Sequence, residues 1–177
     1  MSVNDLAETK QPTVGVRLMT AADYPAWISM RQAMWPECPL ERHRLEVEQL
    51  LQGDGVVLLA EDADRRAIGL AEVSIRRDHV EGTVSTPVPY LEGWYVVPDC
   101  RGQGVGRALV DAAAAWAMKA GFTEIASDAE LTNEGSIRAH VRLGFREAGR
   151  TVHFVRQLCA DATNGIESAT PPSEPGP

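Results

Sequence analysis

The sequence predicts one domain of the α/β (α+β) class, in which helices flank a mixed and mostly antiparallel central sheet. Strand-like and helix-like segments follow one another in the order βααβββαβαβ. A glycine-rich turn, Arg101–Gly106, joins one of these strands directly to a helix. The length of 177 residues suits one hydrophobic core and is short for two.

The elements of the first half are defined by periodicity and by helix start and stop signals. Thr20-Ala-Ala-Asp23 has a capping-box pattern with Asp in place of Glu, so it predicts the start of a helix. Pro36 breaks the chain, and Pro39 suits the first turn of a second helix. The expected elements are a strand Val14–Leu18, helices Ala21–Trp35 and Leu40–Leu51, and strands Val56–Glu61 and Ala67–Arg76.

The second half is punctuated by glycines. Gly121 is expected to stop one helix, and Gly144 is expected to stop a second helix that Asn133 caps. The expected elements are a strand Tyr90–Val97, a helix Gly104–Ala120, a strand Thr123–Ser127, a helix Asn133–Leu143 and a final strand Thr151–Leu158.

Charge and composition limit the partners. Acidic residues outnumber basic ones by 25 to 17, which gives a net charge of −8. This balance argues against a nucleic-acid partner, because phosphate neutralisation needs clustered Lys and Arg, and it suits a cationic partner better. The polar residues 1–12 and the Pro-rich residues 159–177 are expected to be flexible, which leaves a folded unit over 13–158.

Cysteine and histidine usage gives no sign of a metal site. Three cysteines and four histidines have no zinc-ligand spacing. Cys100 is expected to be a small buried thiol rather than a nucleophile, since no His adjoins it in sequence. No secretory signal and no membrane span of about 18 apolar residues is recognised. We therefore expect a protein of the reducing cytoplasm without a membrane partner.

The segment from Val96 to Gly106 carries the most specific functional signal. Glycines let the backbone turn tightly, and the free N–H groups at the start of the next helix form an anion site suited to a pyrophosphate. A nucleotide P-loop would need Lys-Ser or Lys-Thr after these glycines. A dinucleotide fingerprint would need glycine where Arg107 stands. Both of these motifs are thus excluded.

The pattern Val96-x-Pro-x-x-Arg-Gly-x-Gly-x-Gly106 resembles the coenzyme A pyrophosphate loop of the GCN5-related N-acetyltransferase (GNAT) superfamily. The resemblance implies that acetyl-CoA is the co-substrate and that the strand before the loop splays from its neighbour. That strand would line the pantetheine arm, and loop N–H groups would hold the pyrophosphate. The expected cofactor residues are Trp94, Tyr95, Val96, Arg101, Gly102, Gln103, Gly104, Val105, Gly106 and Asn133. Trp94 and Val96 also suit the sheet core, and Asn133 suits a plain N-cap.

Further fragments, in their order and spacing, resemble the aminoglycoside 6'-N-acetyltransferases over nearly all of 14–158. The fragments are Met34-Trp-Pro36, Ala71–Arg76, Pro89–Gly93, Ala126-Ser-Asp128, Asn133 and Leu143-Gly-Phe145. This resemblance implies acetyl transfer to the 6'-amine of an aminoglycoside antibiotic, and hence antibiotic resistance, by a homodimer. We expect direct attack by the amine in a ternary complex.

An aminoglycoside carries several ammonium groups, so its pocket needs carboxylates and an aromatic wall. The resemblance places Glu92 and Asp128 in the acceptor site, where either carboxylate can take the proton of the amine or hold an ammonium group. The alternative for Glu92 is a surface carboxylate on a strand, and the alternative for Asp128 is a carboxylate that stabilises a turn or caps the next helix. Trp35 and His79 are the expected aromatic contacts, with core packing and an ordinary loop position as alternatives.

Some positions depart from the subgroup. Cys38, His79 and Gly149 stand where it often has His, Tyr and Glu, which leaves the antibiotic spectrum open. Many superfamily members use a late Tyr to protonate the CoA thiolate, but Phe154-Val155 occupy the last expected strand. Water would then supply the proton, or the thiolate would leave unassisted. Two other functions stay open: transfer to a polyamine, another amino-sugar or a protein amine, and non-catalytic binding of acetyl-CoA.

Overall fold

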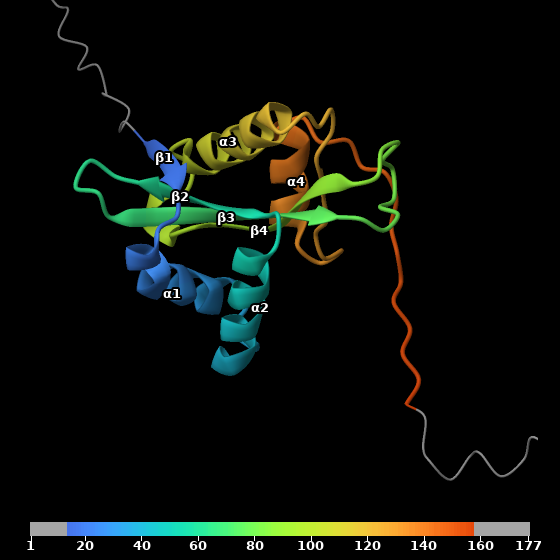
Figure 1. Ribbon diagram of the computed structural model, residues 1–177, viewed down its shortest axis with the longest axis horizontal. Helices are drawn as coiled ribbons and strands as arrows, with labels where there is room; N and C mark the ends of the chain where they lie inside the picture. The colour runs from blue at the N-terminus through green and yellow to red at the C-terminus, as the bar shows by residue number, and fades with distance from the viewer. Residues whose placement is uncertain (1–13, 158–177) are drawn as a thin grey trace, which may run out of the picture.

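The computed structural model describes residues 14–157, in which a five-stranded sheet lies between helices on both faces (Figure 1). The strands are β1 (Gly15–Leu18), β2 (Val56–Glu61), β3 (Ala67–Arg76), β4 (Val88–Val96) and β5 (Ala126–Ser127), in that order across the sheet. Neighbouring strands are antiparallel except β4 and β5, which are parallel. The mixed, mostly antiparallel sheet expected from the sequence is therefore confirmed.

The helices are α1 (Tyr24–Met34), α2 (Leu40–Gln52), α3 (Val105–Lys119) and α4 (Glu134–Arg142), with 3₁₀ turns η1 (Ala21–Asp23) and η2 (Pro98–Cys100). α1 and α2 lie on one side of the sheet, and α3 lies on the other (Figure 1). The helix expected from Ala21 is instead opened by η1. Pro25, in the first turn of α1, has no N–H with which to bond the carbonyl of Ala21, so the α-helical ladder starts later.

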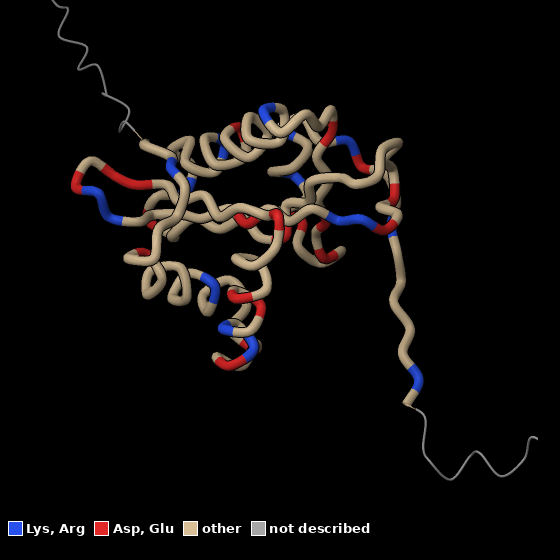
Figure 2. The backbone as a smooth tube through the Cα atoms, in the orientation of Figure 1, with Lys and Arg blue, Asp and Glu red and all other residues tan. Residues whose placement is uncertain are grey.

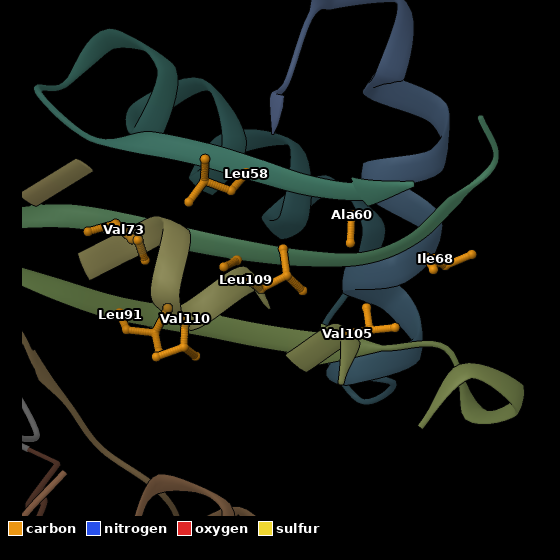
Figure 3. Packing of buried hydrophobic residues seen from close by; sticks show 10 residues of the cluster. Leu58, Ala60, Ile68, Val73, Leu91, Val105, Leu109 and Val110 are labelled. Atoms are coloured by element: carbon orange, nitrogen blue, oxygen red, sulfur yellow. The ribbon is translucent and has the colours of Figure 1, made fainter. Parts of the chain in front are cut away.

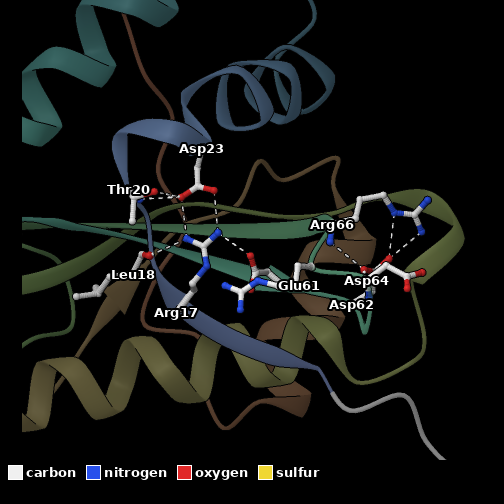
Figure 4. A network of polar contacts seen from close by, with 9 residues as sticks. Arg17, Leu18, Thr20, Asp23, Glu61, Asp62, Asp64 and Arg66 are labelled. Atoms are coloured by element: carbon white, nitrogen blue, oxygen red, sulfur yellow. Dashed lines mark hydrogen bonds and ion pairs between the residues drawn. The ribbon is translucent and has the colours of Figure 1, made fainter.

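A polar network ties the start of α1 to the sheet (Figure 4). Arg17 of β1 donates hydrogen bonds of 2.7 and 2.8 Å to the two carboxylate oxygens of Asp23, and one of 2.6 Å to Glu61. Asp23 also accepts from the backbone N–H and the hydroxyl of Thr20, which confirms the capping pattern. Because Arg17 donates hydrogen bonds to the carboxylate of Asp23, the pKa of Asp23 lies well below its ordinary value.

The core has one layer on each face of the sheet. On the α3 face, Leu109 and Val110 pack against Leu58, Val73 and Leu91 of three strands (Figure 3). This packing fixes the start of α3, and with it the glycine-rich turn, against the strands. The buried side chains of the layer under α1 and α2 are Trp27, Met30, Val47, Val57, Leu59 and Leu70.

Charged residues of both signs are spread along the chain (Figure 2). Both α2 and the turn between β2 and β3 carry acidic and basic residues. The part of the chain that the structure describes has no helix that is both long and apolar enough to cross a membrane.

Two sequence expectations about strands need correction. The final strand expected over 151–158 is wrong for 151–157, which has no regular secondary structure, while residue 158 lies outside the described range. A strand requires a paired neighbour, and this segment has none within the described chain. The strand expected from Thr123 shortens to β5, because extension would bring it beside Pro87 and Pro89, which have no N–H to donate. The segments 1–12 and 159–177, which are expected to be flexible, also lie outside the residues that the structure describes.

Candidate active site

The glycine-rich turn leads from η2 into α3. Gly102 and Gly104 have φ values of +74° and +86°, a left-handed conformation that favours glycine. Gly104 is the N-cap of α3 and brings no capping side chain, so the first amides of this 15-residue helix are available to an anion. Gly106 is required for another reason, since a Cβ there would come within 2.7 Å of the indole of Trp94.

The polar side chains of the turn bond to nearby backbone carbonyls, although Arg101 and Gln103 remain exposed. Arg101 donates a hydrogen bond of 2.9 Å to the carbonyl oxygen of Val96 and lies over the ring of Tyr95. Gln103 donates to the carbonyl oxygen of Asp99 at 2.8 Å. Val105 is a buried core residue. The turn therefore presents mainly backbone to a ligand, as the expected pyrophosphate contact requires.

The edge of β4 beside β5 is open over most of its length. β5 pairs with β4 only at Tyr90–Ala126 and Leu91–Ser127, and within residues 14–157 no other strand covers β4 from Glu92 to Val96 on that side. The splayed strand pair expected from the sequence is confirmed. The side chains of Trp94 and Val96 pack against the α3 core, so the core alternative holds for the side chains, while their pantetheine contact stays a prediction.

A β-bulge presents Glu92. Glu72 of β3 faces Gly93 and the next residue faces Leu91, so Glu92 is an extra residue in β4 without a partner. Its carboxylate accepts a hydrogen bond of 2.5 Å from Ser74 and two, of 2.9 and 2.6 Å, from Arg76. This bidentate pairing raises the pKa of Arg76.

Asp128 joins the same polar cluster. It directly follows β5, is exposed, and lies near enough to the hydroxyl of Tyr90 to influence the pKa of that group. Burial, with the nearby carboxylate of Asp128, raises the pKa of Tyr90 well above its ordinary value. The guanidinium of Arg76 lies 3.3 Å from the centre of the Tyr90 ring, so it bridges towards both carboxylates. The two residues expected to act on the acceptor are thus brought together, on β4 and β5, where the strands separate.

Comparison with known proteins bears on this arrangement. The sequence profile described as the acetyltransferase (GNAT) family matches residues 23–145. The chain belongs to the GNAT family. Among its GNAT relatives, an aminoglycoside N(6')-acetyltransferase type 1 of Stenotrophomonas maltophilia is 44% identical over 78% of this chain and 90% of the relative. Another of the same name, from Klebsiella aerogenes, is 44% identical over 81% of this chain and 96% of the relative.

Solved structures agree with the GNAT assignment. AAC(6')-Iy in complex with the bisubstrate analogue CoA-S-monomethyl-acetylneamine is 37% identical, with a TM-score of 0.75, over 82% of this chain and 99% of that one. The unliganded AAC(6')-Ig of Acinetobacter haemolyticus, 36% identical, has the same TM-score and coverage. The GNAT fold, with its open β4 edge next to the glycine-rich turn, is therefore that of enzymes solved with CoA-based ligands.

In this GNAT chain, Trp35 lies beside the bulge. A Cβ at Gly93 would meet its indole at 2.8 Å, so the ring lies directly on the β4 backbone next to Glu92. Trp35 also stacks on His43, with ring centres 6.4 Å apart, and on the guanidinium of Arg31 at 4.8 Å. Trp35 is half-buried, which suits both an aromatic wall and partial core packing.

The structure does not bring every expected residue to this cluster. His79 is largely exposed in the loop between β3 and β4, and its ionic partner is Glu81 at 3.8 Å. Among the contacts of residues 14–157, none joins His79 to Glu92 or Asp128. Asn133 accepts a hydrogen bond of 3.0 Å from the backbone N–H of Ser136, which confirms the N-cap alternative, and its CoA contact stays a prediction.

Sequence reasoning missed the residues that hold the site from behind. Glu72 is almost fully buried, accepts a hydrogen bond from the indole of Trp27, and pairs with Arg31 at 2.6 Å. Burial raises the pKa of Glu72. Ser74 and Arg76 were also missed as partners of the Glu92 carboxylate. Glu72, Ser74 and Arg76 occupy every second position of β3 and therefore lie on one face of the strand. This polar alternation is the signal that could have found them.

One further cluster has side chains of metal-binding type. Cys38, His43 and Glu46 place their potential ligand atoms within 4.8 Å of one another. The two oxygens of Glu46 accept hydrogen bonds from Arg31 at 2.6 Å and Arg42 at 2.9 Å. Because two guanidinium cations already surround this carboxylate, the cluster suits an ion-pair network better than a cation.

Proposed function

We propose that this GNAT enzyme transfers the acetyl group of acetyl-CoA to the 6'-amine of an aminoglycoside by direct attack in a ternary complex, and so confers aminoglycoside resistance. The observation that carries the proposal is the pair of carboxylates, Glu92 and Asp128, at the point where β4 and β5 separate. The glycine-rich turn lies at the other end of the same open edge. The names of the GNAT relatives support an aminoglycoside as the acceptor.

The two carboxylates are assigned different tasks. Three hydrogen bonds from Ser74 and Arg76 occupy Glu92, so its role is to attract and orient an ammonium group of the acceptor. Asp128 is exposed and faces the same region, so it accepts the proton of the attacking amine, directly or through one water. Trp35 supplies the apolar wall against which a sugar ring packs.

The cofactor is acetyl-CoA, with its pyrophosphate on the backbone of Arg101–Gly106 and its pantetheine arm along Trp94–Val96. When bound, it supplies the thioester carbonyl that the amine attacks. Loop N–H groups provide a sequence-independent anion site, which explains why the side chains of the turn are free to stabilise the turn itself.

The test follows CoA release spectrophotometrically with acetyl-CoA and kanamycin. Asp128→Asn is expected to lower kcat roughly 100-fold, the usual contribution of general base catalysis. Glu92→Gln is expected to raise KM for kanamycin about tenfold and to leave KM for acetyl-CoA unchanged. Asp64→Asn, which changes an exposed carboxylate in the turn between β2 and β3, is the matched control.

The acceptor class is decided by the same assay. Saturable release with kanamycin supports the proposal, whereas release with spermidine but not kanamycin would contradict it. Binding of acetyl-CoA without release for any amine would show that the protein is not an enzyme.

We also propose a homodimer in which residues 151–157 of each protomer complete the sheet of the other. These residues leave Phe154 and Val155 more than nine-tenths exposed, although their pattern is strand-forming. β5 is an edge strand, and a cavity of about 330 Å³ beside it is lined by β5, by residues 143–146 and by Glu81 and Gly82. An unpaired edge and an unpaired strand-forming segment satisfy each other in a symmetric pair.

The mass in solution tests the dimer. By sedimentation or light scattering, the protein is expected to be a dimer, and Phe154→Lys is expected to shift it to monomer. Met118→Lys, which changes an exposed apolar residue near the end of α3, is the control. A dimer that withstands Phe154→Lys would contradict strand exchange.

We further propose a cytoplasmic location, where acetyl-CoA is made and thiols stay reduced. Two free cysteines, Cys38 and Cys100, among the described residues are in keeping with a reducing compartment. Fractionation of expressing cells tests this proposal, and recovery of the protein in a periplasmic extract would contradict it.

A further inference from the structure

We propose that Ser127 is a further catalytic residue, which passes a proton from His140 to the departing CoA thiolate. This inference rests on the proposed function. Transfer of the acetyl group breaks the carbon–sulfur bond and leaves an electron pair on sulfur. A proton donor near the sulfur is therefore expected to assist departure.

Ser127 lies at the point where the two strands part. It ends β5, and its hydroxyl is 3.0 Å from the carbonyl oxygen of Leu91. Leu91 and Ser127 directly precede the two acceptor carboxylates, Glu92 and Asp128. A pantetheine arm that follows the open edge from Val96 towards Leu91 covers roughly 16 Å at the usual rise of a strand. Its thioester end would then lie beside the Ser127 hydroxyl.

His140 of α4 lies behind this hydroxyl. Its Nε2 is 3.0 Å from the Ser127 Oγ, and its Nδ1 is 2.8 Å from the carbonyl oxygen of Ser136. A carbonyl oxygen only accepts, so Nδ1 carries a hydrogen. The ring packs edge-on against Trp94 and Phe145, at 5.5 and 5.2 Å between centres, which fixes its orientation.

The cluster has two complete hydrogen-bonding arrangements that differ by one proton. In the first, His140 is an imidazolium, Nε2 donates to Ser127, and the Ser127 hydroxyl donates to the carbonyl of Leu91. In the second, His140 is neutral, and the Ser127 hydroxyl donates to Nε2 instead. Only the hydroxyl hydrogen must reorient between them, so the pair can release and recover a proton without moving the backbone.

The transfer step balances. The amine nitrogen bonds to the acetyl carbon, the carbon–sulfur bond breaks, and the sulfur takes the hydrogen of the Ser127 hydroxyl. The oxygen of Ser127 at the same time takes the Nε2 hydrogen of His140. The neutral His140 is then protonated again by solvent, while Asp128 has received the proton of the amine.

The tyrosines of the chain are less suited to this step. Tyr90 is the nearest, but burial and the adjacent carboxylate of Asp128 raise the pKa of its hydroxyl and make it a weaker acid. Tyr95 and Tyr24 pack on the layer under α1 and α2, on the opposite face of the sheet from α3. Phe154 occupies the segment in which many superfamily members have a late Tyr, and its side chain has no ionisable hydrogen.

The experiment compares Ser127→Ala with Ser127→Thr, which keeps the hydroxyl on a residue suited to a strand. Ser127→Ala is expected to lower kcat with kanamycin roughly 100-fold, at the low end of the range for assisted proton transfer, and to leave the Kd for CoA unchanged. Ser127→Thr is expected to recover most of that loss. His140→Ala is expected to lose a similar factor and to regain turnover on addition of imidazole.

Coupling between the two residues is the decisive readout. If they act in one relay, the double variant Ser127→Ala with His140→Ala is expected to be no slower than either single variant. Independent, multiplicative losses would overturn the relay, as would a Ser127→Ala enzyme within threefold of the unsubstituted one. Failure of the unsubstituted protein to release CoA with kanamycin would refute the proposed function. Loss of CoA release in the Ser127→Ala variant alone would not.

Discussion

Substitution of Gly93 by Ala tests whether Trp35 is an acceptor wall or only core. The added Cβ would lie 2.8 Å from Cη2 of Trp35 and 2.9 Å from Cε of Met34. Ordinary contacts begin at 3.4 Å, so each group must move by at least 0.5 Å. Met34 is flexible and can yield, whereas the indole can move only by leaving its stack on His43 and Arg31.

The expected cost of this overpacking is about 1–3 kcal/mol. Part of it lowers the Tm, and part displaces the wall from the sugar-binding position. A displacement worth about 1.4 kcal/mol raises KM for kanamycin about tenfold. KM for acetyl-CoA is expected to stay constant, because the glycine-rich turn lies at the other end of β4.

The assay measures initial rates of CoA release, with kanamycin varied at saturating acetyl-CoA and then the reverse. Gly15→Ala is the matched control, since a Cβ on this β1 residue meets no atom within 4 Å. A Gly93→Ala enzyme with a lower Tm but a KM for kanamycin within twofold of the original would refute the wall and leave Trp35 as a core residue.

Three further predictions concern charge and backbone. Arg76→Gln removes the guanidinium that both orients Glu92 and competes with an incoming ammonium group for it. We expect the loss of orientation to dominate and to lower kcat/KM for kanamycin about tenfold, whereas Arg77→Gln, on an exposed neighbour, has no such effect; equal effects in steady-state assays would refute the role of the Arg76–Glu92 pair. The pKa of Asp23 is depressed by Arg17, so its stabilisation is present above its ordinary pKa of 3.8 and is lost as pH falls below it. The Tm gap between the original and Asp23→Asn proteins should therefore shrink from pH 7 to pH 3, and a constant gap would contradict the depressed pKa. Gly104→Glu, at a residue with φ of +86°, is expected to abolish CoA binding in calorimetry while circular dichroism stays unchanged; retained affinity would contradict the pyrophosphate assignment.

The parts of the fold that local sequence defines were predicted well. The strands Val56–Glu61 and Ala67–Arg76 have the expected bounds. Two apolar runs separated by a short polar turn define where each strand begins and ends. The glycine-rich turn was found for the same reason, since its conformation depends on its own glycines. The family resemblance then supplied Glu92 and Asp128, which the structure brings together.

The features that were missed depend on partners far away in the chain. The bulge at Glu92 exists only in the register between β3 and β4, and the pairing of Glu72 with Arg31 joins residues 41 positions apart. The segment 151–157 has the composition of a strand, but composition cannot provide a neighbour to pair with.

In the proposed acceptor site, the ion pair between Arg76 and Glu92 means that Arg76 competes with the acceptor for this carboxylate. A carboxylate has about four lone-pair positions, and Ser74 and Arg76 fill three of those on Glu92. An incoming ammonium group must share Glu92 with a resident guanidinium, so an amine with a single charge gains little there. A scaffold with several charges gains from Asp128 as well. Selectivity for polycations then follows from competition with Arg76 for Glu92, and not from a pocket with many free carboxylates. An inhibitor with a cationic group that displaces the guanidinium of Arg76 from Glu92 would block the binding of the acceptor at the same carboxylate.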